Sequence, residues 1–398
     1  MINYNDALKK AESAFKKLKV KTEKVGLLDS LNRIIAEDIY ADTDHPSFTN
    51  SSMDGYAVKY VKGITEWKIK GEASAGSYKN FYVQQGDAVR IMTGSRIPYG
   101  ADTVIPIEDM ILWKNMIKFR KNKSLRRGIN VRIRGEDIKR KELLIKKHTL
   151  LKSNNISIAA SCGKKSIKVF KKLKVGVLAT GNELVDINIK PKNDKIRASN
   201  LYSLLSAIEQ MNMEPVPFGV VKDNKEKILK RIHEALYSGI DILLTTGGVS
   251  AGKYDYLIDV FKELGVKIIF SKVNIKPGKP VVFGEYNKRV LVVGLPGNPV
   301  SCYVNFILFV RNTIMDCLFL NKNFITTAIL KQTLTKQDNK RHFLRGIIHN
   351  KKGTNFVSQT GSQSSANIGG LNSANCLIVF KEELKMLKKG SMAECIMI

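Results

Sequence analysis

The chain has 398 residues, 43% of them hydrophobic, which indicates a globular protein of two to four domains. Five cysteines without a CxxC pair exclude a dense disulfide framework and the usual zinc pattern, and they predict a cytoplasmic protein. The net charge of +30 comes mostly from lysines spread along the chain, and no aromatic residues interleave with the one dense basic stretch, Lys121–Arg134. We therefore expect a solvated basic surface that favours small polyanionic substrates, and no nucleic acid.

The first part of the chain changes from a helical to a β pattern. Apolar side chains recur at helical spacing over residues 4–18 and again over residues 27–39, which predicts two opening helices. From Asp42 to about Asp137, short alternating or β-branched runs are separated by Gly, Pro and Asn. This pattern predicts a β-rich segment.

Two stretches of this β-rich segment are not explained by strand patterning. Asp54 lies in an Asp-Gly turn within NSSMDGYAV, and it is either a plain turn residue or a functional carboxylate. The second stretch, residues 86–109, holds Thr93 and Gly94 close in sequence to acidic side chains.

From Lys174 the chain alternates between strand and helix patterns. The first predicted strand, Lys174–Thr180, is closed by Gly181, Asn182 and Glu183. The other strands are predicted over residues 215–221, 241–246, 281–283 and 290–293, and the helices over residues 199–211, 226–237 and 255–264. This alternation predicts a doubly wound, mainly parallel sheet with right-handed crossovers.

The last predicted strand runs into GLPGNPVS, where Asn298 is expected to cap and Pro299 to start a long helix. The apolar run Val300–Leu320 contains charged and amide side chains, so it predicts a buried helix and no membrane span. After about Asn321 the pattern is β again. The predicted fold class is multidomain α/β plus β: a central doubly wound, mainly parallel α/β domain, a β-rich N-terminal insert and a small C-terminal β-barrel.

The stretch Asp241–Tyr256, DILLTTGGVSAGKYDY, predicts a buried strand, a glycine turn and the start of a helix. At the carboxyl edge of a parallel sheet, the backbone N–H groups of such a turn point toward a bound anion. Gly247–Lys253 also fits the GxxxxGK spacing of a phosphate loop, but Tyr254 stands where that loop needs Ser or Thr. A tight turn without a ligand remains an alternative, since strand-to-helix turns favour glycine.

Each predicted strand of the α/β section brings polar groups to this same edge. These groups are Thr180, Glu183, Asp223, Gly247, Gly248, Ser250 and Asp255. Three converging carboxylates, Glu183, Asp223 and Asp255, repel one another unless a divalent cation or bound protons neutralise them. The sequence therefore predicts a magnesium site.

The segment KVNIKPGK adds Lys272, Lys276 and Lys279 beside this edge. Carboxylates for a metal and lysines for oxyanions predict phosphoryl or nucleotidyl chemistry, or transfer of another tetrahedral oxyanion. Because lysine is abundant throughout the chain, any one of the three can instead be an ordinary surface residue. No nucleophile activated by a histidine is recognisable.

Six sequence blocks resemble those of the molybdopterin molybdenumtransferase family, and the chain is similar also to the carboxy-terminal region of gephyrin. In chain order the blocks are SSMDGYAV, GDAVRIMTGSRIPYGADTVIPIED, GVLATGNELV, TTGGVSAGKYDY, KPGKP and GLPGNPVS. The resemblance implies an enzyme that binds adenylylated molybdopterin and molybdate, needs magnesium or a similar divalent cation, and releases AMP as molybdenum enters the dithiolene.

The resemblance also implies an elongated homodimer of four-domain subunits. The expected divisions are a linking domain of residues 1–43 and 138–172, a β-rich insert of residues 44–137, an α/β molybdopterin-binding domain of residues 173–321 and a barrel of residues 322–398. Possible partners are molybdopterin adenylyltransferase and molybdoenzyme maturation proteins.

The sheet-edge pattern and the resemblance together indicate two sets of site residues. The catalytic set is Asp54, Thr93, Glu183, Asp223, Asp255, Lys272 and Lys276. The substrate-binding set is Thr180, Gly181, Gly247, Gly248, Ser250, Gly252, Lys279, Pro296, Pro299 and Ser365. Ser365 rests on the stretch GSQSSAN, which departs from the family pattern, and Asp54 and Thr93 are expected to act across the dimer interface.

Two alternatives to this function follow from the same residues. A molybdopterin adenylyltransferase shares the α/β domain but usually stands alone, so the long β-rich amino-terminal region disfavours it. A non-catalytic scaffold similar to gephyrin would tolerate the loss of the three carboxylates, which this sequence retains.

Overall fold

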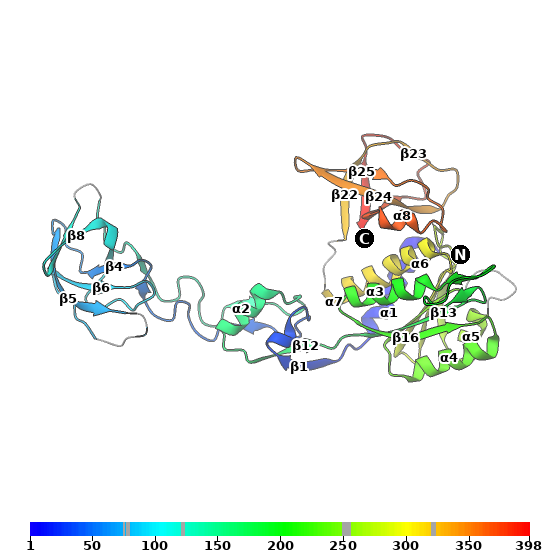
Figure 1. The fold of residues 1–398 in the computed structure, drawn as a ribbon, viewed down its shortest axis with the longest axis horizontal. Helices are drawn as coiled ribbons and strands as arrows, with labels where there is room; N and C mark the ends of the chain where they lie inside the picture. Colours follow the sequence, from blue (N-terminus) through cyan, green and yellow to red (C-terminus); the bar gives the residue numbers. More distant parts are fainter. Residues whose placement is uncertain (75, 77–79, 121–123, 249–255, 320–323) are drawn as a thin grey trace.

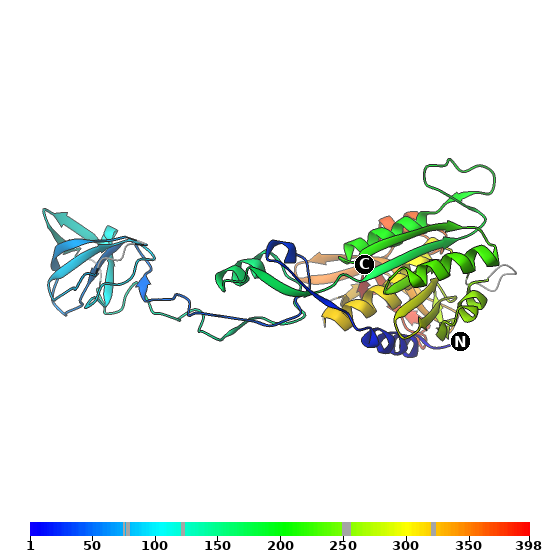
Figure 2. The ribbon, with the colours of Figure 1, turned by 90° about the horizontal axis from the view of Figure 1, so that it is seen from below.

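The computed structural model describes residues 1–74, 76, 80–120, 124–248, 256–319 and 324–398, which form an elongated molecule (Figure 1). An outer β body, residues 50–132, lies at one end, and a thin linking module, residues 22–45 with 138–170, follows it (Figures 1 and 2). At the other end an α/β body, from residue 174 to residue 319, carries a small barrel that begins at residue 325.

The outer β body is built on a six-stranded sheet in the order β7-β4-β6-β5-β9-β8. Alternate residues of one strand enter different cores, because Tyr56 packs with Trp67 on one face and Ala57 packs with Val89 on the other. The elements of this body are β3 (Asn50–Ser51), β4 (Gly55–Val58), β5 (Glu66–Ala73), β6 (Asp87–Ile91), β7 (Thr103–Pro106), η2 (Ile107–Asp109), β8 (Met110–Trp113), β9 (Met116–Phe119) and β10 (Val131–Arg132). The predicted β-rich insert is confirmed.

The linking module is made by a segment that runs outward and a segment that returns. Strands β1 (Thr22–Gly26) and β2 (Ile39–Tyr40) pair antiparallel with β12 (Ser166–Phe170) and β11 (Leu143–Ile145). Helix α2 (Ser153–Ser161) packs beside them, and its Ala159 belongs to the same small core.

The predicted helix over residues 27–39 is wrong. Only η1 (Leu28–Ser30) is helical in this stretch, and Asn32 has a φ of 60°, which interrupts a right-handed helix. Ile34 and Ile35 instead form bridges with Leu150 and Val169 of the returning segment. Pairing with a distant segment therefore outweighs the helical spacing of the apolar residues.

The α/β body contains a six-stranded sheet in the order β16-β13-β17-β21-β20-β18. Its first four strands are parallel, and the last two pair antiparallel at one edge. The strands are β13 (Lys174–Thr180), β16 (Glu214–Val221), β17 (Ile242–Thr246), β18 (Lys267–Ser271), β20 (Val282–Tyr286) and β21 (Val290–Leu295). The carboxyl ends of the parallel strands therefore meet at one edge.

Helices cover both faces of this sheet, as the predicted doubly wound fold requires. Side chains of α1 (Tyr4–Lys17), α3 (Ser199–Gln210) and α6 (Pro299–Phe306) enter the core on one face. Side chains of α4 (Lys225–Tyr237) and α5 (Leu257–Glu263) enter the core on the other face. A small parallel pair, β14 (Leu184–Val185) with β15 (Ile196–Arg197), projects beside the edge (Figure 2).

The predicted buried helix after Pro299 is confirmed. Helix α6 continues into a π-helical turn, η3 (Ile307–Arg311), and then into α7 (Asn312–Phe319). Residues such as Val304 and Leu308 have no exposed surface. Within the described part of the chain, no helix is both long enough and apolar enough to cross a membrane.

The carboxy-terminal strands close a barrel, because β24 pairs with both β25 and β26 while β22 and β28 complete the ring. Strand β19 (Ile275–Lys276) of the α/β body pairs parallel with the start of β24, which attaches the barrel beside the sheet edge. The elements are β22 (Ile325–Leu330), β23 (Leu334–Thr335), β24 (Arg341–Lys351), β25 (Thr354–Gln359), α8 (Gly369–Asn372), β26 (Cys376–Phe380), β27 (Met386–Leu387) and β28 (Met392–Met397).

Candidate active site

A cleft of about 1170 Å³ opens between the carboxyl edge of the parallel sheet and the barrel. The residues that we predicted for the site and that line this cleft are Thr180, Gly181, Glu183, Asp223, Gly247, Gly248, Lys276, Lys279, Pro296, Pro299 and Ser365. Ser250, Gly252 and Asp255 lie outside the described residues. The sheet edge and the cleft therefore coincide, as the strand-turn-helix pattern predicts.

The glycine turn after β17 depends on two residues in the left-handed region. Gly247 has a φ of 94° and Gly248 a φ of 64°. A Cβ atom on Gly247 would lie 2.2 Å from the carbonyl oxygen of Thr180, so no larger residue fits there without a backbone shift. The Thr180 hydroxyl is buried and has no hydrogen-bond partner among the described residues. It lies against the glycine turn, since a Cβ atom on Gly248 would be 3.1 Å from the Thr180 Oγ1.

Replacing Gly247 with Ala should lower the free energy of unfolding by about 2 kcal/mol or more, because backbone strain adds to the clash with Thr180. Gly239→Ala is the matched control, since Gly239 has a φ of 83° and open space around its Cβ position. Urea unfolding of both variants measures the difference. Equal stability losses would show that the close approach at Gly247 has no energetic consequence.

Asn200, at the start of α3, ties two loops of the sheet edge together. Its Nδ2 donates to the Thr246 hydroxyl over 3.0 Å and to the carbonyl oxygen of Gly297 over 2.7 Å. The Thr246 hydroxyl in turn donates to the carbonyl oxygen of Pro296 over 3.1 Å. Local sequence patterns do not indicate these contacts, because the partners of Asn200 lie far from it in the chain.

The two described carboxylates of the predicted metal site both line the cleft. Asp223 Oδ2 accepts a hydrogen bond of 3.0 Å from the Asn182 backbone N–H, and Asn182 Oδ1 accepts one of 3.2 Å from the Asp223 backbone N–H. This reciprocal pair fixes Asp223 against Asn182, the residue that precedes Glu183. Among the described residues no group of three His, Cys, Asp or Glu side chains could hold a metal ion. The third predicted carboxylate, Asp255, is outside that set.

Lys276 and Lys279 line the cleft on either side of Pro277 and Gly278. Gly278 has a φ of 89°, and its carbonyl oxygen accepts a hydrogen bond of 3.1 Å from the buried Asn305 side chain. The third predicted lysine, Lys272, does not line the cleft and is exposed in the loop after β18. The structure therefore brings together two of the three lysines.

Ser365 reaches the start of α6 from the barrel. Its carbonyl oxygen accepts a hydrogen bond of 3.2 Å from the Val300 backbone N–H, and its hydroxyl accepts one of 3.2 Å from Asn298 Nδ2. Asn298 occupies the predicted capping position, but its side chain makes no capping hydrogen bond. The Asn298 side chain does not cap the helix and instead connects the α/β body to the barrel through its hydrogen bond to Ser365.

Sequence analysis missed Arg345, which lies on β24 and is 1% exposed. Its guanidinium donates to the carbonyl oxygens of Asn367 over 2.7 Å, Ser362 over 2.6 Å and Ser364 over 3.1 Å. Burial lowers the pKa of this group, and no carboxylate of the described residues pairs with it. Arg345 thereby holds the loop that carries Ser365 against the cleft. The signal in the sequence that could have identified Arg345 is its charge within the mostly apolar run HFLRGII.

Asp54 and Thr93 lie in the outer β body, at the opposite end of the subunit from the cleft (Figure 1). Asp54 Oδ1 accepts hydrogen bonds from the Thr93 backbone N–H over 2.6 Å and from the Thr93 hydroxyl over 2.7 Å. These two bonds, the backbone one first, lower the pKa of the Asp54 carboxyl. Asp54 and Thr93 are thus hydrogen-bonded to each other, and they lie far from the cleft of their own subunit (Figure 1).

Three family models match consecutive parts of the chain. They are the MoeA N-terminal region (domain I and II) over residues 2–163, a probable molybdopterin binding domain over residues 176–316, and the MoeA C-terminal region (domain IV) over residues 327–398. These matches include both the outer β body and the barrel.

Relatives of known name extend over nearly the whole chain. Molybdopterin molybdenumtransferase of Bacillus subtilis is 32% identical over 389 residues, which cover 95% of this chain and 90% of the relative. The enzyme of that name from Staphylococcus aureus is 32% identical over 382 residues, covering 94% and 90%. A crystal structure of the molybdopterin biosynthesis MoeA protein from Pyrococcus horikoshii has 29% identity and a TM-score of 0.83, covering 100% of this chain and 99% of the other. The chain therefore belongs to the molybdopterin molybdenumtransferase (MoeA) family.

Proposed function

We propose that the protein inserts molybdate into adenylylated molybdopterin and releases AMP, which gives molybdenum cofactor. The observation that carries this proposal is the single cleft in which a glycine turn, two carboxylates and two lysines converge. Membership of the family over nearly the whole chain supports the same reaction.

Each part of the cleft suits one part of this chemistry. The backbone N–H groups of the glycine turn suit phosphate oxygens, which accept hydrogen bonds from N–H groups. Lys276 and Lys279 suit the negative charge of the phosphate and of molybdate. Ser365 and Pro299 close the cleft where the barrel meets α6.

We propose Glu183 and Asp223, together with Asp255, as ligands of a magnesium ion. The donor chemistry fits, since Mg²⁺ prefers carboxylate and phosphate oxygens, and both described carboxylates line the cleft. When bound, magnesium would neutralise charge on the phosphate oxygens. The hydrogen bond from Asn182 orients the Asp223 carboxylate for this role.

We also propose a cytoplasmic homodimer in which Asp54 and Thr93 of one subunit complete the cleft of the other. The support is the distance of the outer β body from the cleft within one subunit (Figure 1). The carboxylate held ionised by Thr93 would then add to the metal and substrate contacts made by the α/β body.

Incubation of the protein with adenylylated molybdopterin, magnesium and molybdate tests the proposed reaction. AMP release that depends on both molybdate and magnesium is the expected result. A parallel reaction with ATP and molybdopterin, followed by release of pyrophosphate, tests for the adenylyltransferase alternative. A protein that releases neither AMP in the first reaction nor pyrophosphate in the second would support a scaffold, and the proposed activity would be wrong.

A further inference from the structure

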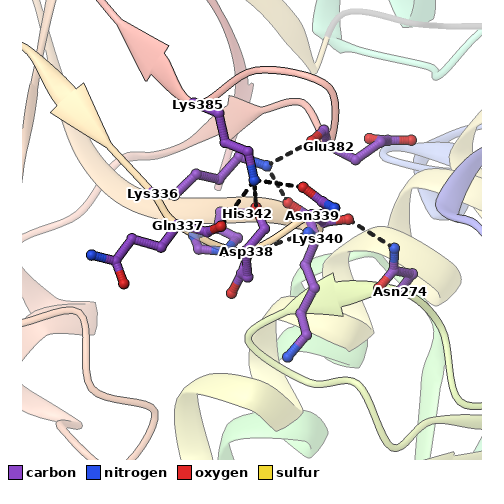
Figure 3. Close-up of polar contacts among 9 residues, drawn as sticks. All are labelled: Asn274, Lys336, Gln337, Asp338, Asn339, Lys340, His342, Glu382 and Lys385. Atoms are coloured by element: carbon purple, nitrogen blue, oxygen red, sulfur yellow. Dashed lines mark hydrogen bonds and ion pairs between the residues drawn. The ribbon is translucent and has the colours of Figure 1, made fainter.

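The barrel loop of residues 336–340 is held by donors that bind its oxygen atoms from two sides (Figure 3). The Lys385 ammonium donates to the carbonyl oxygen of Gln337 over 2.9 Å, to Asn339 Oδ1 over 2.5 Å and more weakly to the carbonyl oxygen of Asp338 over 3.4 Å. The Lys336 ammonium donates to the carbonyl oxygens of Lys340 and Glu382. These contacts make the loop a fixed platform.

The α/β body contributes to the same platform. Asn274, just before β19, donates from its side chain to the carbonyl oxygen of Asn339 over 3.0 Å. Lys336 is only 7% exposed, and burial lowers the pKa of its ammonium, which also lies 5.1 Å from the centre of the Phe380 ring. Because burying an ammonium is costly, such a group is retained where its hydrogen bonds fix a structure.

Strand register places one face of this platform on the cleft. Lys276 of β19 pairs with His342 of β24, and Lys340 lies in the bend that leads directly into β24. Lys276, Lys340 and His342 all line the cleft. Arg341 lies on the other face, where it contacts Glu382 over 2.6 Å.

The Lys340 ammonium is left available on this face. Asp338 is the nearest acidic residue in sequence, and its Oδ1 is already engaged by His342 Nε2 over 2.7 Å and by the Lys340 backbone N–H over 3.2 Å. Within the described ranges no carboxylate forms an ion pair with Lys340. Figure 3 shows its side chain leading away from the cluster of hydrogen bonds.

We propose that Lys340 is a substrate-binding residue whose ammonium contacts the oxygen atoms of a tetrahedral oxyanion in the cleft. That oxyanion is either the phosphate of the adenylyl group or molybdate. Lys336 and Lys385 are positioning residues that act through Lys340. The inference rests on the proposed function, and it adds the barrel as a third source of positive charge beside Lys276 and Lys279.

The test compares Lys340→Met with Lys351→Met, which removes the same charge from the exposed far end of β24. Lys340→Met should raise the KM for one substrate about tenfold while kcat changes little, since one charge-assisted contact is lost. The increase should shrink at high salt, and Lys351→Met should match the parent. A higher KM for adenylylated molybdopterin with weaker AMP inhibition identifies the phosphate, whereas a higher KM for molybdate alone identifies molybdate.

Calorimetric titration with AMP and with molybdate separates this inference from the proposed reaction, because it needs no turnover. If the parent binds either anion and Lys340→Met binds it equally well, the inference is wrong even when AMP release is observed. If the parent binds neither anion, the inference is also wrong. If the parent binds an anion more tightly than Lys340→Met but releases no AMP, only the proposed reaction fails.

A double-mutant comparison tests the positioning role of Lys385. Lys385→Met should raise the same KM as Lys340→Met, and the double variant should be no worse than Lys340→Met alone, because both changes remove one contact. Thermal unfolding of each variant identifies loss of the barrel fold. Additive increases in KM among folded variants would show that Lys385 does not act through Lys340.

Discussion

Glu183→Gln should reduce molybdate-dependent AMP release by about 100-fold, because the amide cannot supply the negative charge that a magnesium ligand needs. Glu183 and Asp223 both line the cleft, and Gln has nearly the same shape as Glu, so the fold should be unaffected. The magnesium concentration at half-maximal rate should also rise. Steady-state AMP release across a magnesium titration measures both effects.

Glu209→Gln is the matched control, because it makes the same change of charge. Glu209 is exposed near the end of α3, away from the cleft. The control variant should behave as the parent protein does. The midpoint temperature of thermal unfolding, measured without magnesium, should be the same for the parent, Glu183→Gln and Glu209→Gln. If Glu183→Gln keeps full activity at limiting magnesium, Glu183 is no metal ligand and the proposed magnesium site needs other residues.

Mixing an Asp54→Ala chain with a Glu183→Ala chain should restore activity from two inactive parents. In a two-fold dimer with shared sites, one site of each heterodimer receives both mutations and the other receives neither. A random equal mixture should then reach about one quarter of the parent activity, since about half of its dimers are heterodimers with one intact site. AMP release after subunit exchange measures the recovery.

We expect mixing to restore activity because the outer β body, which carries Asp54, is far from the cleft of its own subunit (Figure 1). Native mass measurement must show that heterodimers form, because failed exchange would also give no activity. If heterodimers form but have no activity, Asp54 and Glu183 belong to a site that is built by one chain. Full activity of Asp54→Ala alone would remove Asp54 from the active site, and its hydrogen bonds with Thr93 would then serve only the turn.

The sequence determined the α/β body and most of one wall of the cleft. Strands such as Lys174–Thr180 and Ile242–Thr246 are short, apolar and followed by glycine, and in a parallel sheet their ends must meet at one edge. Thr180, Glu183, Asp223 and Gly247 could therefore be placed together from local pattern alone. Ser365 could not, because only the family resemblance pointed to it.

Only the tertiary structure decided which of the remaining polar residues reach the cleft. Lys272 and Lys276 are equivalent by composition, but the pairing of β19 with β24 carries Lys276 into the cleft and leaves Lys272 in an exposed loop. Lys340, which directly precedes β24, also lines the cleft. Strand register between distant segments depends on how whole faces pack, and local residue patterns do not specify it.

Residues 27–39 and the outer β body also show that local residue patterns do not specify contacts between distant segments. Helical spacing of apolar residues predicted a helix, and bridges to Leu150 and Val169 made the segment extended instead. The family resemblance pointed to Asp54 and Thr93 separately, and only the structure showed that they are hydrogen-bonded to each other in the outer β body, with the linking module between that body and the cleft (Figure 1). Local propensity is weak compared with the burial of Ile35 and Ile39 in a core that the returning segment completes.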